Sequence, residues 1–146
     1  MKRFTVDVQL DVEVSSAVEK KLMTAAVATL QHQSVSSPAT LTLLLTDDDQ
    51  LRALNQAYRG YDEVTDVLSF EDGSELPEIG LYLGDIAISV AQAQRQADQQ
   101  GHRLLDELCL LTVHGVLHLL GHDHAEPDEK ARMWAAQEEV LSQLGK

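Results

Sequence analysis

Three histidines near the C-terminal end of the chain, His114, His118 and His124, have the residue type and spacing of a metal site. His114 and His118 are four residues apart, so on an α-helix they stand on one face, about 40° apart around the axis. Gly121 follows, where the helix can end and the chain can turn, and His124 lies just past that turn. Three imidazoles that leave one position open form the ligand set of a catalytic zinc ion. We therefore predict one zinc site, since neutral imidazoles favour zinc over nickel, copper or iron here.

Residues around this motif are weaker ligand candidates. His122 would continue the same helical stripe, but three ligands suffice, so we expect it to support a ligand histidine or to end the helix. Asp123 could orient a ligand imidazole. Cys109 would lie about 140° around the helix from His114, and we expect a small buried residue there rather than a ligand.

The same spacing, H-x-x-x-H-x-x-G-x-x-H, also matches the metzincin zinc proteases, with one exception that matters for chemistry. In those proteases a glutamate directly follows the first histidine and serves as the general base. Gly115 stands at that position here. With glycine in place of glutamate, the three metal ligands are still present, but the peptidase mechanism lacks its proton acceptor. A metallohydrolase acting on peptides is therefore kept only as an alternative.

The elements that must position these residues follow from the hydrophobic periodicity. Strands are predicted at residues 3–14, 40–46, 65–70 and 81–89, and helices at 17–32, 48–58, 90–100, 103–121 and 127–144. The acidic segment 71–79 contains Gly and Pro and is predicted to be an exposed loop. This order predicts an α+β (α/β layer) fold, a small mixed four-stranded sheet packed with about five helices. The metal-binding helix is the most apolar and should be central, and residues 1–146 are expected to form a single metallohydrolase domain.

The location expected for the protein is the cytoplasm. The N-terminus alternates polar and apolar residues and lacks the apolar core of a signal peptide. No apolar run approaches the roughly 20 residues of a membrane span. The single cysteine forms no internal disulfide, which fits a reducing compartment.

The net charge of −13 argues against sequence-independent clamping onto nucleic acid. An RNA substrate would need a local basic patch, and Arg52 and Arg59 could form one because they share nearly the same face of a predicted helix. We expect Arg52 instead to pair at the surface with Asp48 or Asp49. The run 47–49 of three aspartates is expected to cap the start of that helix rather than to bind a metal.

Two further segments connect the histidine motif to a known family. These are Leu54-Asn55-x-x-Tyr58-Arg59-Gly60-x-Asp62-x-x-Thr65-Asp66-Val67-Leu68-Ser69-Phe70 and Leu83-Gly84-Asp85-Ile86. Together with the histidines they resemble the YbeY family of bacterial zinc-dependent endoribonucleases, over roughly residues 40–125. Members of the family often carry prolines where this chain has Val64 and Glu71, a difference that affects turn geometry more than chemistry.

The resemblance implies that the three histidines bind one Zn²⁺ ion and that Arg59 is the functional arginine close to it. A guanidinium is well suited to stabilising charge on phosphoryl oxygens. Asp66 and Asp85 are weaker candidates, each of which could orient a histidine or Arg59, or cap a loop.

The activity that the resemblance implies is single-strand-specific RNA cleavage in rRNA processing, including maturation of the 16S rRNA 3′ end, and in ribosome quality control. The partners implied are ribosomal RNA, the small ribosomal subunit with its proteins, and an assembly GTPase. A ribosome-assembly factor with a structural zinc ion is the non-enzymatic alternative.

Overall fold

The computed structural model describes residues 4–77, 80–122 and 125–145. Within these residues the chain forms four strands and five helices, which confirms the predicted α+β fold. In chain order they are β1 (Phe4–Leu10), α1 (Ser16–His32), β2 (Ala39–Thr46), α2 (Asp48–Arg59), β3 (Val67–Leu76), β4 (Gly80–Ser89), α3 (Val90–Gln100), α4 (Leu104–Leu119) and α5 (Pro127–Leu144).

The strands form one mixed sheet in the order β1-β2-β4-β3. β1 and β2 are parallel, as are β2 and β4, whereas β3 and β4 pair antiparallel. β2 is an interior strand of this order, and its Leu41, Leu43 and Leu45 are fully buried. β3 is an edge strand, so one of its two sides has no strand partner among the described residues.

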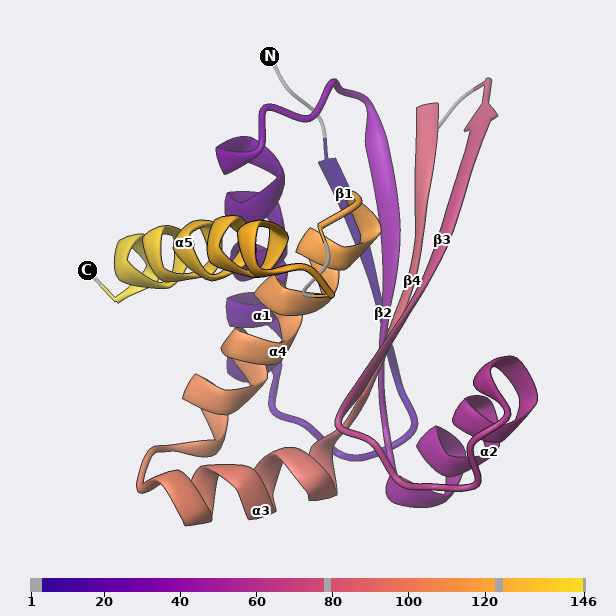
Figure 1. Ribbon diagram of the computed structural model, residues 1–146, viewed down its shortest axis with the longest axis vertical. Coiled ribbons are helices and arrows are strands. Elements are labelled where there is room, and N and C mark those ends of the chain that lie inside the picture. The colour runs from indigo at the N-terminus through magenta and orange to yellow at the C-terminus, as the bar shows by residue number, and fades with distance from the viewer. Residues whose placement is uncertain (1–3, 78–79, 123–124, 146) are drawn as a thin grey trace.

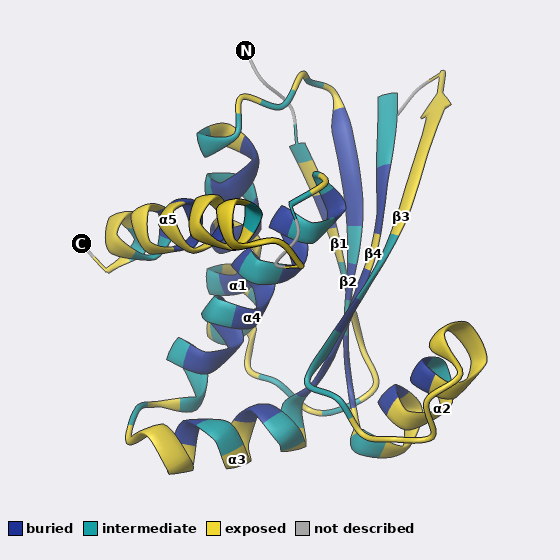
Figure 2. Cartoon of the chain, in the orientation of Figure 1, coloured by how far each residue is buried: buried dark blue, intermediate teal, exposed yellow. Residues whose placement is uncertain are grey.

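The helices cover the two faces of the sheet unequally (Figure 1). α1 and α4 pack against one face, α5 crosses outside them, and α2 lies near one end of the other face. Burial is concentrated in α4, which carries Leu108, Val113, Val116 and Leu117 in the core (Figure 2). α4 contacts the other helices of its layer and two strands, so the predicted central position of the helix that carries His114 and His118 is confirmed.

Two predicted element boundaries were wrong. β1 ends at Leu10 rather than at residue 14, because the chain bends once the amide of Asp11 has donated to the carbonyl of Leu45. The segment 71–76 is not a loop: it continues β3 and pairs with β4 across a register shift between Glu71 and Ser74. Its side chains are exposed as expected. The sequence of this segment shows no alternation of apolar and polar residues, because this end of the edge strand carries mainly polar side chains on both faces of the sheet.

The starts of α1 and α5 are set by residues with a strong preference for the first turn of a helix. Ser15 caps α1 by accepting a hydrogen bond from the amide of Val18, and Pro127 opens α5. Cys109 is buried on α4, as predicted, and its burial raises the pKa of the thiol. In the part of the chain described here, no helix combines the length and the apolar character needed to cross a bilayer.

Candidate active site

Helix α4 brings the imidazoles of His114 and His118 face to edge, with their Nε2 atoms 3.1 Å apart. Both side chains are half-buried, whereas most of their helix neighbours are buried. Two nitrogens that share a tetrahedral zinc ion at its usual bond length stand about 3.3 Å apart. The pair therefore fits two positions in the coordination shell of one ion without rearrangement of α4.

The orientation of His114 is set by α5. Gln137 Oε1 lies 3.1 Å from Nδ1 of His114, and an amide oxygen only accepts hydrogen bonds. Nδ1 therefore carries the ring proton, and the lone pair is on Nε2, the atom that faces His118. The indole of Trp134, one turn earlier on α5, lies with its centroid 5.9 Å from that of His114.

Gln137 is a functional candidate that the sequence reasoning missed. It occupies a buried position in the stripe of α5 that also contains Met133, Ala136 and Val140. A polar residue in an apolar stripe needs a hydrogen-bond partner, and that was the one signal available in the sequence.

Arg59 lies beside the histidines although it belongs to a different helix. It is the last residue of α2, which ends because Gly60 adopts a left-handed conformation with φ 79°. A cavity of about 410 Å³ opens between the end of α2, β3 and α4. Its lining includes Arg59, His114, His118, Thr65, Asp66, Ser69 and Glu71.

The charge of Arg59 is available to a ligand. The side chain is exposed, and its Cζ atom lies 5.5 Å from the ring centroid of Tyr61. Among the described residues, no carboxylate stands within ion-pair distance of it. The cavity thus combines imidazole nitrogens with a guanidinium that has no carboxylate neutralising it in the described structure.

The third predicted ligand, His124, lies outside the described residues, as does Asp123. Gly121, with φ 95°, turns the chain after α4 as expected. His122 Nε2 bonds Gln33 Oε1 at the end of α1, at 2.7 Å, so this imidazole contacts α1. The described residues contain no cluster of three or more metal-binding side chains.

Gly115 is the point where α4 approaches the sheet. A β-carbon added there would meet Cγ2 of Ile86 at 2.8 Å, closer than side chains normally pack. On the β3 side, Ser69 Oγ donates a hydrogen bond of 3.2 Å to the carbonyl of Gly115. A side chain at this position would therefore require Ile86 to move, which gives a packing reason for the absence of the protease glutamate.

Asp66 caps the start of β3 and links it to α3 and α4. Its Oδ1 accepts from the amide of Val67 at 2.8 Å, and its Oδ2 accepts from Nε2 of Gln96 at 3.2 Å. The same Gln96 nitrogen donates to the buried carboxylate of Glu107, which also pairs with His102. Asp66 was expected to orient a histidine or Arg59, or to cap a loop. The structure shows the capping role, and the residue lines the cavity.

Asp85 lies on the other side of the sheet from the histidines. It accepts a hydrogen bond from the hydroxyl of Tyr82, whose oxygen is also 2.7 Å from Oγ1 of Thr42. Burial, followed by the Asp85 carboxylate, raises the pKa of Tyr82. Asp85 lines a second cavity of about 500 Å³, which Tyr58 and Phe70 also line.

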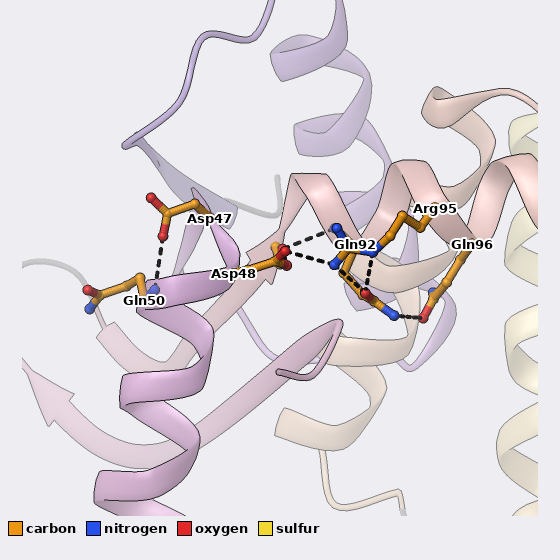
Figure 3. Close-up of polar contacts among 7 residues, drawn as sticks. Asp47, Asp48, Gln50, Gln92, Arg95 and Gln96 are labelled. Atoms are coloured by element: carbon orange, nitrogen blue, oxygen red, sulfur yellow. Dashed lines mark hydrogen bonds and ion pairs between the residues drawn. The ribbon is translucent and has the colours of Figure 1, made fainter. Parts of the chain in front are cut away.

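The capping role predicted for the aspartate run is confirmed for Asp47 (Figure 3). Asp47 Oδ1 accepts from the amide of Gln50 at 2.9 Å and caps the helix. Asp48 accepts from Ser89 Oγ at 2.7 Å and from Arg95 Nη2 at 2.8 Å. The hydrogen bond from Ser89 and the guanidinium of Arg95 lower the pKa of Asp48.

The partner predicted for Arg52 was wrong. Its guanidinium forms a two-pronged ion pair with Asp62, at 2.6 and 3.1 Å, rather than with Asp48 or Asp49. The loop after Gly60 folds back along α2 and places Asp62 within reach. Arg52 is therefore neutralised by this pair and does not extend the basic patch around Arg59.

Asn55 fixes the same loop, a role that was not predicted although the residue belongs to the motif shared with the family. It is 4% exposed, and its Nδ2 donates to the carbonyl of Glu63 at 3.1 Å. This bond closes the turn between the end of α2 and the start of β3. Together with the Arg52–Asp62 pair, it holds the segment that displays Arg59.

Comparison with known proteins finds relatives that match nearly the whole chain. The family model described as Endoribonuclease YbeY matches residues 5–145. A protein named Endoribonuclease YbeY from Roseiflexus sp. (strain RS-1) is 45% identical, over 97% of this chain and 93% of its own length. One of the same name from Chloroflexus aurantiacus (strain J-10-fl) is 44% identical, over 97% and 96% respectively.

A solved structure shows the same fold. The solution structure of TM1509 from Thermotoga maritima superimposes with a TM-score of 0.67 and covers 95% of this chain and 88% of that protein. The two sequences are 24% identical, so the likeness supports the arrangement of strands and helices alone.

Proposed function

Because the chain belongs to the YbeY endoribonuclease family, we propose that it is a metal-dependent endoribonuclease that cuts single-stranded RNA. The observation that carries this proposal is the cavity in which Arg59 of α2 and the two histidines of α4 meet. Hydrolysis of a phosphodiester needs a metal site and a cation that stabilises charge on the phosphoryl group. This cavity offers candidates for both.

The metal site in this proposal consists of His114, His118 and His124, of which the last is assigned from the sequence motif alone. The Nε2 separation of 3.1 Å in the first two supports it. A zinc ion held there would supply Lewis acidity and a source of hydroxide near neutral pH. Gln137 keeps His114 in the tautomer whose Nε2 can be a ligand.

Arg59 is the residue that we assign to the phosphate. Its guanidinium can donate two parallel hydrogen bonds to phosphoryl oxygens and stabilise the negative charge that builds up during cleavage. The cavity volume of about 410 Å³ is in the range of sites that hold one small ligand. This volume suits one nucleotide of an extended strand better than a duplex, which supports a preference for single-stranded RNA.

The biological substrate in this proposal is ribosomal RNA. The family resemblance favours processing of the 16S rRNA 3′ end and a role in ribosome quality control. The net charge of −13 adds a physical reason for partners, because such a chain does not attract RNA at long range. We propose that the small ribosomal subunit, its proteins and an assembly GTPase deliver the RNA.

A cleavage assay with RNA and peptide substrates distinguishes this proposal from a peptide-cleaving metallohydrolase and from an assembly factor with a structural zinc ion. Zinc-loaded protein would be incubated with a single-stranded oligoribonucleotide, the same sequence as a duplex, and a mixture of peptides. We expect cleavage of the single strand only. The cavity suits one extended strand better than a duplex, and Gly115 stands where a zinc protease carries its general base. Peptide cleavage without RNA cleavage would support a metallohydrolase of another class. Zinc-dependent thermal stabilisation without any cleavage would support a structural zinc ion.

A further inference from the structure

Exposed apolar side chains flank Arg59 in the sequence. Tyr58 is 69% exposed, Tyr61 is 54% exposed and Val64 is 42% exposed. These are three of the seven large hydrophobic residues that are exposed in the described part of the chain. Aromatic side chains usually bury most of their surface, so two exposed tyrosines on either side of the candidate phosphate ligand in the sequence call for an explanation.

The segment that carries Tyr61 is held in place. Its neighbours Asp62 and Glu63 are tied to α2 through Arg52 and Asn55 respectively. The Tyr61 ring lies 5.5 Å from the guanidinium carbon of Arg59. A ring that is fixed before a ligand arrives loses little freedom on binding, which favours a contact role.

Tyr58 faces a different cavity from its neighbour Arg59. Its ring packs on Phe70 at a centroid distance of 5.0 Å and a tilt of 57°, and both rings line the second cavity. The charged side chain in the described lining of that cavity is the carboxylate of Asp85. A phosphate would be repelled there, whereas a neutral aromatic ring would find aromatic walls and a few polar atoms.

We infer that Tyr58 and Tyr61 are stacking platforms for nucleobases on either side of the phosphate at Arg59, with the base on Tyr58 entering the second cavity. This inference rests on the proposed function of the histidine–arginine cavity. It also explains how an acidic chain can bind RNA. With one available guanidinium at the described site, phosphate contacts contribute little affinity. Base stacking supplies affinity that does not depend on charge or sequence.

Binding measurements test the platforms without cleavage. A fluorescent single-stranded oligoribonucleotide would be titrated with chelator-treated full-length protein and followed by anisotropy. We expect Tyr58→Ala and Tyr61→Ala each to weaken binding by roughly fivefold to one hundredfold. Tyr58→Phe and Tyr61→Phe should stay close to wild type because they keep the ring. Met23→Ala, an exposed apolar position on α1, is the matched surface control.

Two further readouts distinguish stacking from a structural effect. Oligonucleotides with abasic sites should bind the wild type weakly and show no further loss with the alanine variants. The salt dependence should be shallow, with a slope of about −0.7 for each phosphate contacted, and the same in the variants.

Unchanged RNA affinity in both alanine variants, or equal affinity of the wild type for abasic RNA, would overturn the inference and leave the tyrosines as a surface for a protein partner. If the zinc-loaded wild type does not cut RNA at all, it is the proposed function that fails, whatever the tyrosine variants bind.

Discussion

The side-chain oxygen of Gln137 on α5 lies 3.1 Å from Nδ1 of His114 on α4. The last helix of the fold thereby selects the tautomer and the orientation of a candidate metal ligand on the central helix. Losing a hydrogen bond of this kind typically weakens metal binding ten- to hundredfold. The effect of a Gln137 substitution on metal affinity is therefore large enough to measure.

Replacing Gln137 should weaken metal binding without disturbing the fold. We expect Gln137→Leu to lower affinity about 10- to 100-fold, because Nδ1 of His114 loses its acceptor. Gln137→Glu keeps an acceptor and should retain most of the affinity. Binding can be followed with Co²⁺ through the fluorescence of Trp134, the one tryptophan of the chain, whose ring lies 5.9 Å from His114. Equal affinities for the leucine variant and the wild type would exclude the orienting role.

The close approach of α4 to the sheet predicts a specific coupling between Gly115 and Ile86. Gly115→Ala should cost about 1–3 kcal/mol of unfolding free energy, because the new methyl overlaps Cγ2 of Ile86. Ile86→Ala alone should also destabilise the protein by leaving a cavity. In the double variant the new methyl gains the vacated space, so the loss should be smaller than the sum of the single losses. Additive losses in denaturant unfolding would show that the two residues do not collide.

Removing the guanidinium of Arg59 should separate catalysis from metal binding. We expect Arg59→Ala to lower RNA cleavage by about 10²- to 10³-fold, the usual cost of losing one group that stabilises transition-state charge. Metal content and thermal stability should stay at wild-type values, since Arg59 is exposed at a helix end. Arg103→Ala is the control, because this exposed arginine lies at the start of α4 and pairs there with Asp106, three residues further along the chain. Wild-type cleavage rates for Arg59→Ala would remove it from the site.

The contacts of Asp48 predict a pH-dependent contribution to stability. Its pKa is lowered in the folded protein by Ser89 and then Arg95, so the ionised form is favoured by folding. That contribution is present above the unfolded pKa of about 3.9 and is lost as the pH falls through the lower folded value. Asp48→Asn should therefore cost about 0.5–1 kcal/mol at pH 7, and the difference should shrink below about pH 4.

The neighbouring Asp49 provides the control for this effect. It lies in the same first turn of α2, is exposed, and shares the favourable position near the helix N-terminus. Asp49→Asn should change the free energy of unfolding less than Asp48→Asn at pH 7. If the two variants have the same pH profile, the helix terminus accounts for the effect and the contacts with Ser89 and Arg95 do not.

Periodicity predicted most elements because each one has a face in the core. The stripe of α1 and the apolar run of β2 were predicted from the sequence for this reason. The second half of β3, residues 71–76, could not be predicted in the same way. Backbone pairing with β4 holds it, while its side chains are exposed, so no apolar pattern marks it.

The candidate site was predictable only where its residues share an element or a motif. His114 and His118 are placed together by helical geometry, which needs no tertiary information. Arg59 was singled out through the family resemblance, and the cavity that joins it to the histidines follows from the packing of α4 against β3 and β4. Gln137 depends on the angle at which α5 crosses α4, and the partner of Arg52 depends on how a loop folds back. Neither leaves a signal at fixed sequence spacing.

The most direct test of the central claim is cleavage of single-stranded RNA before and after zinc is restored to metal-depleted protein, with metal content measured on the same samples. The account predicts that the depleted wild type is inactive and regains activity with one equivalent of Zn²⁺, whereas His114→Ala neither retains zinc nor cuts RNA. Cleavage by His114→Ala at the wild-type rate, or full activity of the depleted protein, would contradict it.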